Sequence, residues 1–203
     1  MANQIDDKPS LPKEYTQLKY LESLPNPNIG MCVIDTGIYA KNTISEIILQ
    51  GNNSGSSGPR IPIGYSDYYG TCFLGYKDKY YGVNSTSLFS VESSKKIKAI
   101  VKFTTAGSTK IVDASISDEV LSASGGSYIS VSNIKLFGPY TTMNSSYNFI
   151  GKIFYCKISD IDSDTVLGEY IPALRIADSK PGMYDLVSGQ FFTNKGPGEF
   201  TYG

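Results

Sequence analysis

The chain has 203 residues but no histidine, no tryptophan and only 18% charged residues. The absence of histidine excludes Ser-His-Asp triads, histidine metal ligands and histidine pH switches. Eighteen Lys+Arg against 19 Asp+Glu give a net charge of −1, without the basic excess that is typical of nucleic-acid binding. No apolar run approaches the roughly 18 residues of a membrane span. We therefore expect neither nucleic acid nor a membrane among the partners.

Cysteine is scarce and unpaired in sequence. Cys32, Cys72 and Cys156 are widely spaced and form no CxxC motif, which excludes a zinc knuckle and a thioredoxin-like site. We expect buried free thiols that pack as small apolar groups, with no metal and no cofactor. The first residues are polar and acidic, unlike a secretory signal peptide, so we expect synthesis in the cytoplasm.

Short alternating or apolar runs, broken by Gly, Asn, Ser and Pro, fill most of the chain. In Lys96–Phe103 apolar residues alternate with lysines, which predicts a strand with one wet face. In Lys152–Ser159 the same period places Phe154, Cys156 and Ile158 on one face. No window keeps a helical period over three turns. Strands are expected at Thr16–Glu22, Met31–Ile34, Thr43–Gln50, Gly70–Tyr76, Lys79–Val83, Lys96–Phe103, Thr109–Ile116, Tyr128–Phe137, Lys152–Ser159, Thr165–Pro172, Gly182–Leu186, Gln190–Thr193 and Glu199–Tyr202.

Turn signals about every ten residues favour an all-β fold, an antiparallel two-sheet sandwich or a barrel. Residues 1–14 are polar, carry Pro9 and Pro12, and read as an extended N-terminal arm. The Gly/Ser-rich stretch at 51–59 is too short for a domain linker. Residues 15–203 are therefore expected to form one domain.

Both ends of the chain carry a recognisable pattern. Residues 15–37 read YTQLKYLESLPNPNIGMCVIDTG, and residues 151–203 contain GKIFYCKI, EYIPALR and PGMYDLVSGQFFTNKGPGEFTYG. These segments resemble the opening and closing of concanavalin A-like (laminin G-type) β-sandwich domains of phage virion and bacterial surface proteins. The resemblance implies a jelly-roll sandwich.

The matching residues also have a structural interpretation of their own. In the Ile34–Gly37 stretch, Asp and Thr side chains can accept from nearby backbone N–H groups, and Gly tolerates a positive φ. The closing motif is read as a hairpin with core aromatics. Within it, Arg175 is expected to pair with Asp185 or with a turn carbonyl.

Catalytic chemistry is poorly supported by the acidic residues. Glycoside hydrolases, some of which share this fold, need two carboxylates that flank the sugar bond. Asp118 and Glu119 are adjacent and would point to opposite faces of a strand. We expect no enzyme and no catalytic residues, although a pair of carboxylates from distant strands stays open. The seven isolated glutamates are Glu14, Glu22, Glu46, Glu92, Glu119, Glu169 and Glu199.

Asp160, Asp162 and Asp164 are spaced like the start of an EF-hand loop. That loop needs Gly at its sixth position and Glu at its twelfth, where this chain has Thr165 and Ile171. We therefore favour a solvated acidic turn over a cation site.

A tyrosine-rich region supplies the residue types of a lectin-like site, in which rings contact the sugar and Asp or Asn bind hydroxyls. The competing interpretation is that these tyrosines fill half-buried sheet positions, where the ring packs and the hydroxyl meets water. The candidate carbohydrate-binding residues are Tyr65, Asp67, Tyr68, Tyr69, Tyr80, Tyr81 and Asn84.

The resemblance implies a non-enzymatic accessory protein of a bacteriophage virion, either a capsid decoration or a tail-associated protein. In this hypothesis residues 1–14 bind other virion proteins, and the lectin-like sandwich adheres to host-surface polysaccharide. The alternatives are a carbohydrate-binding module on a bacterial cell surface and, less favoured, a glycoside hydrolase. Edge strands of sandwiches pair readily, so a homo-oligomer stays open.

Overall fold

Every regular element in the described part of the chain is a β-strand, which confirms the all-β prediction. The computed structural model describes residues 10–24, 32–52, 60–64, 73–76, 79–81, 88–92, 94–106, 109–116, 121–125, 133–138 and 149–203. The strands are β1 (Tyr15–Gln17), β2 (Leu21–Ser23), β3 (Ile34–Tyr39), β4 (Thr43–Gly51), β5 (Arg60–Gly64), β6 (Phe73–Tyr76), β7 (Lys79–Tyr81), β8 (Leu88–Glu92), β9 (Lys96–Ala106), β10 (Thr109–Ile116), β11 (Leu121–Gly125), β12 (Asn133–Leu136), β13 (Gly151–Asp160), β14 (Val166–Arg175), β15 (Lys180–Asp185), β16 (Phe191–Phe192) and β17 (Phe200–Tyr202).

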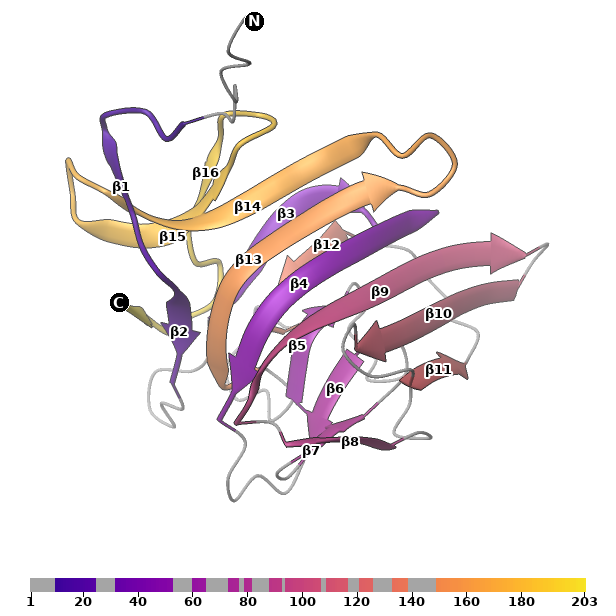
Figure 1. The fold of residues 1–203 in the computed structure, drawn as a ribbon. Coiled ribbons are helices and arrows are strands. Elements are labelled where there is room, and N and C mark those ends of the chain that lie inside the picture. Colours follow the sequence, from indigo (N-terminus) through magenta and orange to yellow (C-terminus); the bar gives the residue numbers. More distant parts are fainter. Residues whose placement is uncertain are drawn as a thin grey trace, which may run out of the picture.

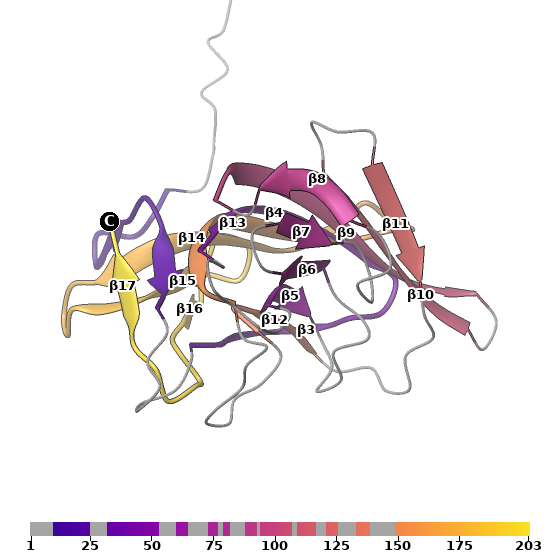
Figure 2. The same ribbon diagram turned by 90° about the horizontal axis from the view of Figure 1, so that it is seen from below.

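These strands form two antiparallel sheets that lie face to face (Figures 1 and 2). The larger sheet has the order β11-β10-β9-β4-β13-β14-β15-β16, with β1, β2 and β17 attached beside β13 and β14. The smaller sheet has the order β3-β12-β5-β6-β7-β8. The arrangement is sandwich-like, as the sequence pattern predicts.

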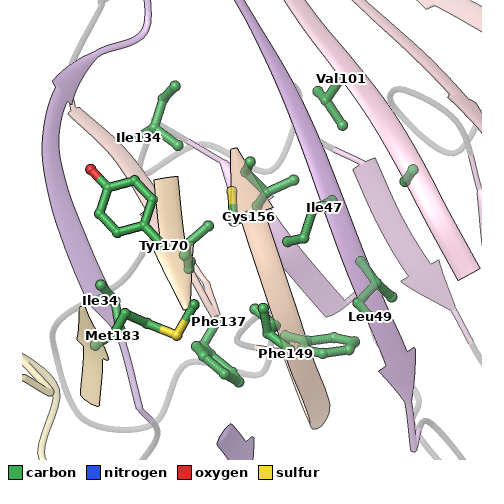
Figure 3. Close-up of a cluster of buried hydrophobic side chains, with 14 of the residues drawn as sticks. Ile34, Ile47, Leu49, Val101, Ile134, Phe137, Phe149, Cys156, Tyr170 and Met183 are labelled. Carbon is green, nitrogen blue, oxygen red and sulfur yellow. The ribbon is translucent and has the colours of Figure 1, made fainter. Parts of the chain in front are cut away.

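The core lies between the sheets and follows from the alternation within the strands (Figure 3). Ile47 and Leu49 of β4 are fully buried, and they join Ile34, Ile134 and Leu136 of the smaller sheet in one cluster. Burial of each such side chain contributes about 1.5–3 kcal/mol. The expected solvent-facing side of β9 is present, because the lysines of this strand alternate with its own buried apolar residues.

Two of the cysteines belong to this core. Cys32 and Cys156 are buried free thiols, as expected. Burial raises the pKa of Cys32 to about 12 and that of Cys156 well above its usual range, so both thiols stay protonated at neutral pH. Cys72 lies outside the described residues.

The predicted common face of Phe154 and Cys156 is wrong. The register of β13 against β4 shifts between Ile153 and Tyr155, so Phe154 is an extra residue in its strand. Such a bulge re-aims the side chain. Phe154 is half-buried, and its ring contacts Lys96 and Tyr20 on the outer face of the sheet.

The N-terminal strands fill a gap in the larger sheet. β14 pairs with β13 only over Val166–Tyr170, and beyond this point the two strands separate. There β1 pairs with Ala173–Arg175 of β14, while β2 pairs with Gly151–Ile153 of β13 (Figure 1). The predicted strand Thr16–Glu22 is therefore split in two, because the chain must cross from one partner to the other between Gln17 and Leu21.

A buried carboxylate organises the closing hairpin. Asp185 accepts hydrogen bonds from the backbone N–H groups of Glu169 (2.8 Å) and Val187 (3.1 Å) and from the Ser188 hydroxyl (2.6 Å). The expected pairing of Arg175 with Asp185 is wrong, because these residues lie at opposite ends of the β14–β15 pair. Arg175 instead pairs with Asp178 at 2.7 Å, which lowers the pKa of that carboxyl to about 2.

Replacement of Tyr170 with Phe tests the link between the two sheets. The buried Tyr170 hydroxyl donates to the Thr36 carbonyl of β3 at 3.1 Å. We expect Tyr170→Phe to lower the free energy of unfolding by about 1 kcal/mol in urea denaturation, because this hydrogen bond is lost. Tyr202→Phe is the control, since Tyr202 is 45% exposed and should change stability by less than about 0.5 kcal/mol. Equal stability of the two variants would contradict the link.

Candidate functional site

A groove of about 340 Å³ lies where the edges of the two sheets meet. β3 ends the smaller sheet and β16 ends the larger one. We call this space the edge groove. One side of it carries Asp35, Gly37 and Asn133, and the other carries Gln190, the Phe191–Phe192 strand, Thr193 and Lys195.

The β3 side is shaped by the Ile34–Gly37 motif as the sequence predicts. Gly37 has a φ of +73°, and its N–H donates to Asp35 Oδ1 at 3.0 Å. Thr36 Oγ1 accepts from the Ile38 N–H at 3.2 Å and donates to the Ile134 carbonyl at 2.7 Å. These bonds fix the Asp35–Ile38 backbone and tie it to β12 beside the groove.

The β16 side is held in place by its aromatic rings. Phe192 packs edge-on against the buried Tyr170, with ring centroids 5.6 Å apart. Phe191 lies 5.1 Å from the Tyr15 ring on the outer face. A Cβ at Gly182 would come within 2.7 Å of the Phe191 ring, so glycine is required for this close approach.

Asn194 organises the loop that continues the groove. Its Oδ1 accepts from the N–H groups of Val33 and Gly196, both at 2.8 Å. Its Nδ2 donates to the carbonyl of Gly196 at 3.0 Å and to that of Gly198. A neighbouring cleft of about 350 Å³ begins here and shares Thr193 with the edge groove.

The edge groove offers the chemistry of hydroxyl recognition. Asn133 and Gln190 carry amides that both donate and accept, Asp35 accepts and Lys195 donates, while the phenylalanine strand adds apolar surface. Sites for small polar ligands combine these features. Among the described residues that line the groove, Asp35 is the one carboxylate, whereas canonical glycoside hydrolysis uses two.

The carbohydrate-binding residues predicted from the sequence are not tested by the described structure. Tyr65, Asp67, Tyr68, Tyr69 and Asn84 lie outside the described residues. Tyr80 and Tyr81 belong to β7, of which the backbone alone is described.

The smaller sheet does, however, connect the edge groove with Gly64, the last described residue before this region. Lys135 pairs with Asp35 on one side and with Gly64 on the other. Gly64 therefore lies two strands from Asp35, roughly 10 Å away, and Tyr65 is the next residue in the sequence. The sequence analysis missed the edge groove because the Asp35 and Gln190 segments are about 155 residues apart, and periodicity does not show which strand edges lie side by side.

The Asp160–Asp164 stretch is a turn between β13 and β14. Asp160 Oδ1 accepts from the N–H groups of Asp162 (3.0 Å) and Ser163 (2.9 Å) and from the Ser163 hydroxyl, which lowers the pKa of Asp160. No cluster of three or more His, Cys, Asp or Glu side chains suited to a metal occurs in the part of the chain that the structure describes. That part also contains no helix with the length and apolarity to cross a membrane.

Comparison of the sequence with protein-family models and with curated proteins gives no match.

Replacement of Asn194 with Asp tests whether the hydrogen bonds of this side chain stabilise the loop. The variant keeps an acceptor for Val33 but places carboxylate oxygen against the Gly196 and Gly198 carbonyls. We expect the free energy of unfolding to fall by about 1–3 kcal/mol, measured by urea denaturation, because two donors are lost in a half-buried site. Gln17→Glu, at an exposed position of β1, is the matched control. A variant as stable as this control would rule out the structural role of Asn194.

Proposed function

We propose that the sandwich is a concanavalin A-like jelly roll and that the protein is a non-enzymatic accessory component of a bacteriophage virion, displayed on the capsid or tail. Two features support the proposal. The motifs at the two ends of the chain resemble such domains, and the described strands form a sandwich-like pair of antiparallel sheets.

The edge groove supports a binding role for the displayed domain. It combines two amides, one carboxylate, one ammonium group and apolar surface in an open groove of about 340 Å³. This composition suits a saccharide of the host surface, held by hydroxyl contacts. Many copies on one particle would make weak single contacts effective.

The N-terminal arm is the proposed attachment to other virion proteins. Its last residues contact the domain, since Ile176 N–H donates to the Glu14 carbonyl and Tyr15 N–H to the Pro12 carbonyl, both at 3.0 Å. The preceding polar residues are the part of the arm that would dock on a capsid or tail protein.

Deletion of residues 1–11 tests the attachment. This deletion keeps the Pro12 and Glu14 carbonyls, so we expect an unchanged urea midpoint for the domain. We also expect the truncated protein to be missing from purified particles, as measured by mass spectrometry. Normal incorporation of the truncated protein would exclude the arm as the anchor.

A glycan array tests saccharide binding and separates the two candidate regions. We expect Gln190→Ala and Lys195→Ala to weaken binding roughly three- to tenfold, because each removes a hydrogen-bonding group from the groove. Tyr65→Ala, Asp67→Ala, Tyr68→Ala and Tyr69→Ala form a second set for the predicted tyrosine site. Gln17→Ala is the control for the exposed surface.

The array result decides between the regions. If both sets bind as the parent does, the saccharide role is wrong. Release of reducing sugar from host polysaccharide would favour a hydrolase instead. In the alternative hypothesis, the protein is a carbohydrate-binding module of the bacterial surface and uses the same groove. Recovery of the protein from cell envelopes but not from particles would favour that alternative.

A further inference from the structure

Two lysines lie on the outer face of the larger sheet, on the strands at either side of β4. Figure 1 shows the larger sheet with this face toward the viewer. Lys96 of β9 and Lys152 of β13 both pair with Gln50 of the central strand β4. Each precedes a buried isoleucine, so both side chains point outward. With strands about 4.8 Å apart, their Cα atoms are roughly 10 Å apart.

Aromatic rings hold both ammonium groups. Lys96 Nζ lies 4.0 Å from the Phe154 ring centroid, and Lys152 Nζ lies 4.3 Å from that of Tyr20. The two rings pack edge to face at 5.7 Å. We call these four residues the lysine platform.

The rings position the charges without neutralising them. A ring attracts a cation through its quadrupole and carries no net charge. Lys98 on the same strand differs, because it forms an ion pair with Glu46 at 2.7 Å. Within the described residues, neither platform lysine forms such a pair.

A polar cleft of about 230 Å³ adjoins the platform. It is lined by Glu22, Gln50, Asn52, Ser94 and Lys152, together with two glycines. Gln50 Nε2 donates to the Ser94 carbonyl at 2.8 Å, which fixes one wall. The cleft therefore offers hydroxyl, amide and carboxylate groups within reach of a fixed ammonium group.

We propose that the lysine platform and this cleft bind an acidic polysaccharide, through the carboxylate of a hexuronic acid residue. The carboxylate lies between the two ammonium groups, and the sugar hydroxyls enter the cleft. Lys98, which is paired with Glu46, and Lys102 lie farther along the same face of β9, with Ile100 between them. The exposed Lys102 adds a positive charge, which suits a polymer with repeated negative charges. This site is separate from the edge groove and does not depend on it.

The chemistry favours a polysaccharide over a nucleic acid. Single-stranded nucleic acids bind by stacking their bases on exposed aromatic faces. In the platform an ammonium group already covers a face of each ring. The net charge of −1 also lacks the excess of basic residues that phosphate backbones require.

Binding to immobilised polygalacturonate tests the proposal, with its methyl ester as the neutral form of the same polymer. We expect the full chain to bind polygalacturonate with an affinity that falls as salt rises, and to bind the ester weakly. Lys96→Gln and Lys152→Gln should each weaken binding roughly fivefold or more. Lys41→Gln, which removes an exposed charge at the turn before β4, should change binding less than about twofold.

A ring variant separates the platform from net charge alone. Phe154→Leu keeps apolar packing and all lysines but removes the ring beneath Lys96, so it should also weaken binding, with unfolding in urea as the check on folding. Gln17→Ala, at an exposed position of β1, should leave polygalacturonate binding unchanged. Equal binding of the ester, unchanged binding by both lysine variants, or tighter binding of single-stranded DNA would overturn the proposal.

Discussion

Strands β13 and β14 pair directly at one end and separate at the other, where residues 15–23 occupy the space between them. β1 takes up the free edge of β14, and β2 takes up that of β13. β17 then pairs with the other side of β2, while the N–H groups of Lys19 and Tyr20 donate to the Gly203 carbonyl. An unfilled gap would leave these backbone groups without partners, at a cost of about 1–3 kcal/mol for each group that stays buried.

The same nine residues support both candidate sites. Tyr15 lies against Phe191, whose strand forms one side of the edge groove. Tyr20 holds the ammonium group of Lys152 in the lysine platform. Neither tyrosine is a proposed ligand contact in itself. Each tyrosine positions a neighbouring residue that is a proposed ligand contact. The segment that fills the gap in the larger sheet therefore also sets the geometry of both candidate sites.

Much of the fold was predictable because local periodicity survives in the structure. The strand at Thr109–Ile116 is confirmed to the residue, and the one at Thr43–Gln50 is one residue longer. The strand that begins at Lys96 extends to Ala106 instead of Phe103. No strand was expected at Arg60–Gly64, and Pro62 within it cannot donate to a ladder, yet its carbonyl accepts from the Phe137 N–H at 2.9 Å. The sites were beyond prediction for a different reason. The bulge at Phe154 and the pairing of Lys96 and Lys152 with Gln50 depend on register, which periodicity alone does not specify.

The pairing of β2 with β17 joins residues about 180 positions apart. Contacts of such large sequence separation slow folding, because the entropy of closing the chain is lost before the contact forms. Ribosomes add roughly 5–20 residues per second, so the segment at 21–23 waits for roughly 10 s or longer between its own synthesis and that of residues 200–202. Throughout that interval Leu21, a fully buried residue of the finished core, has no strand on one side. The larger sheet can therefore be completed only after residues 200–202 have been synthesised.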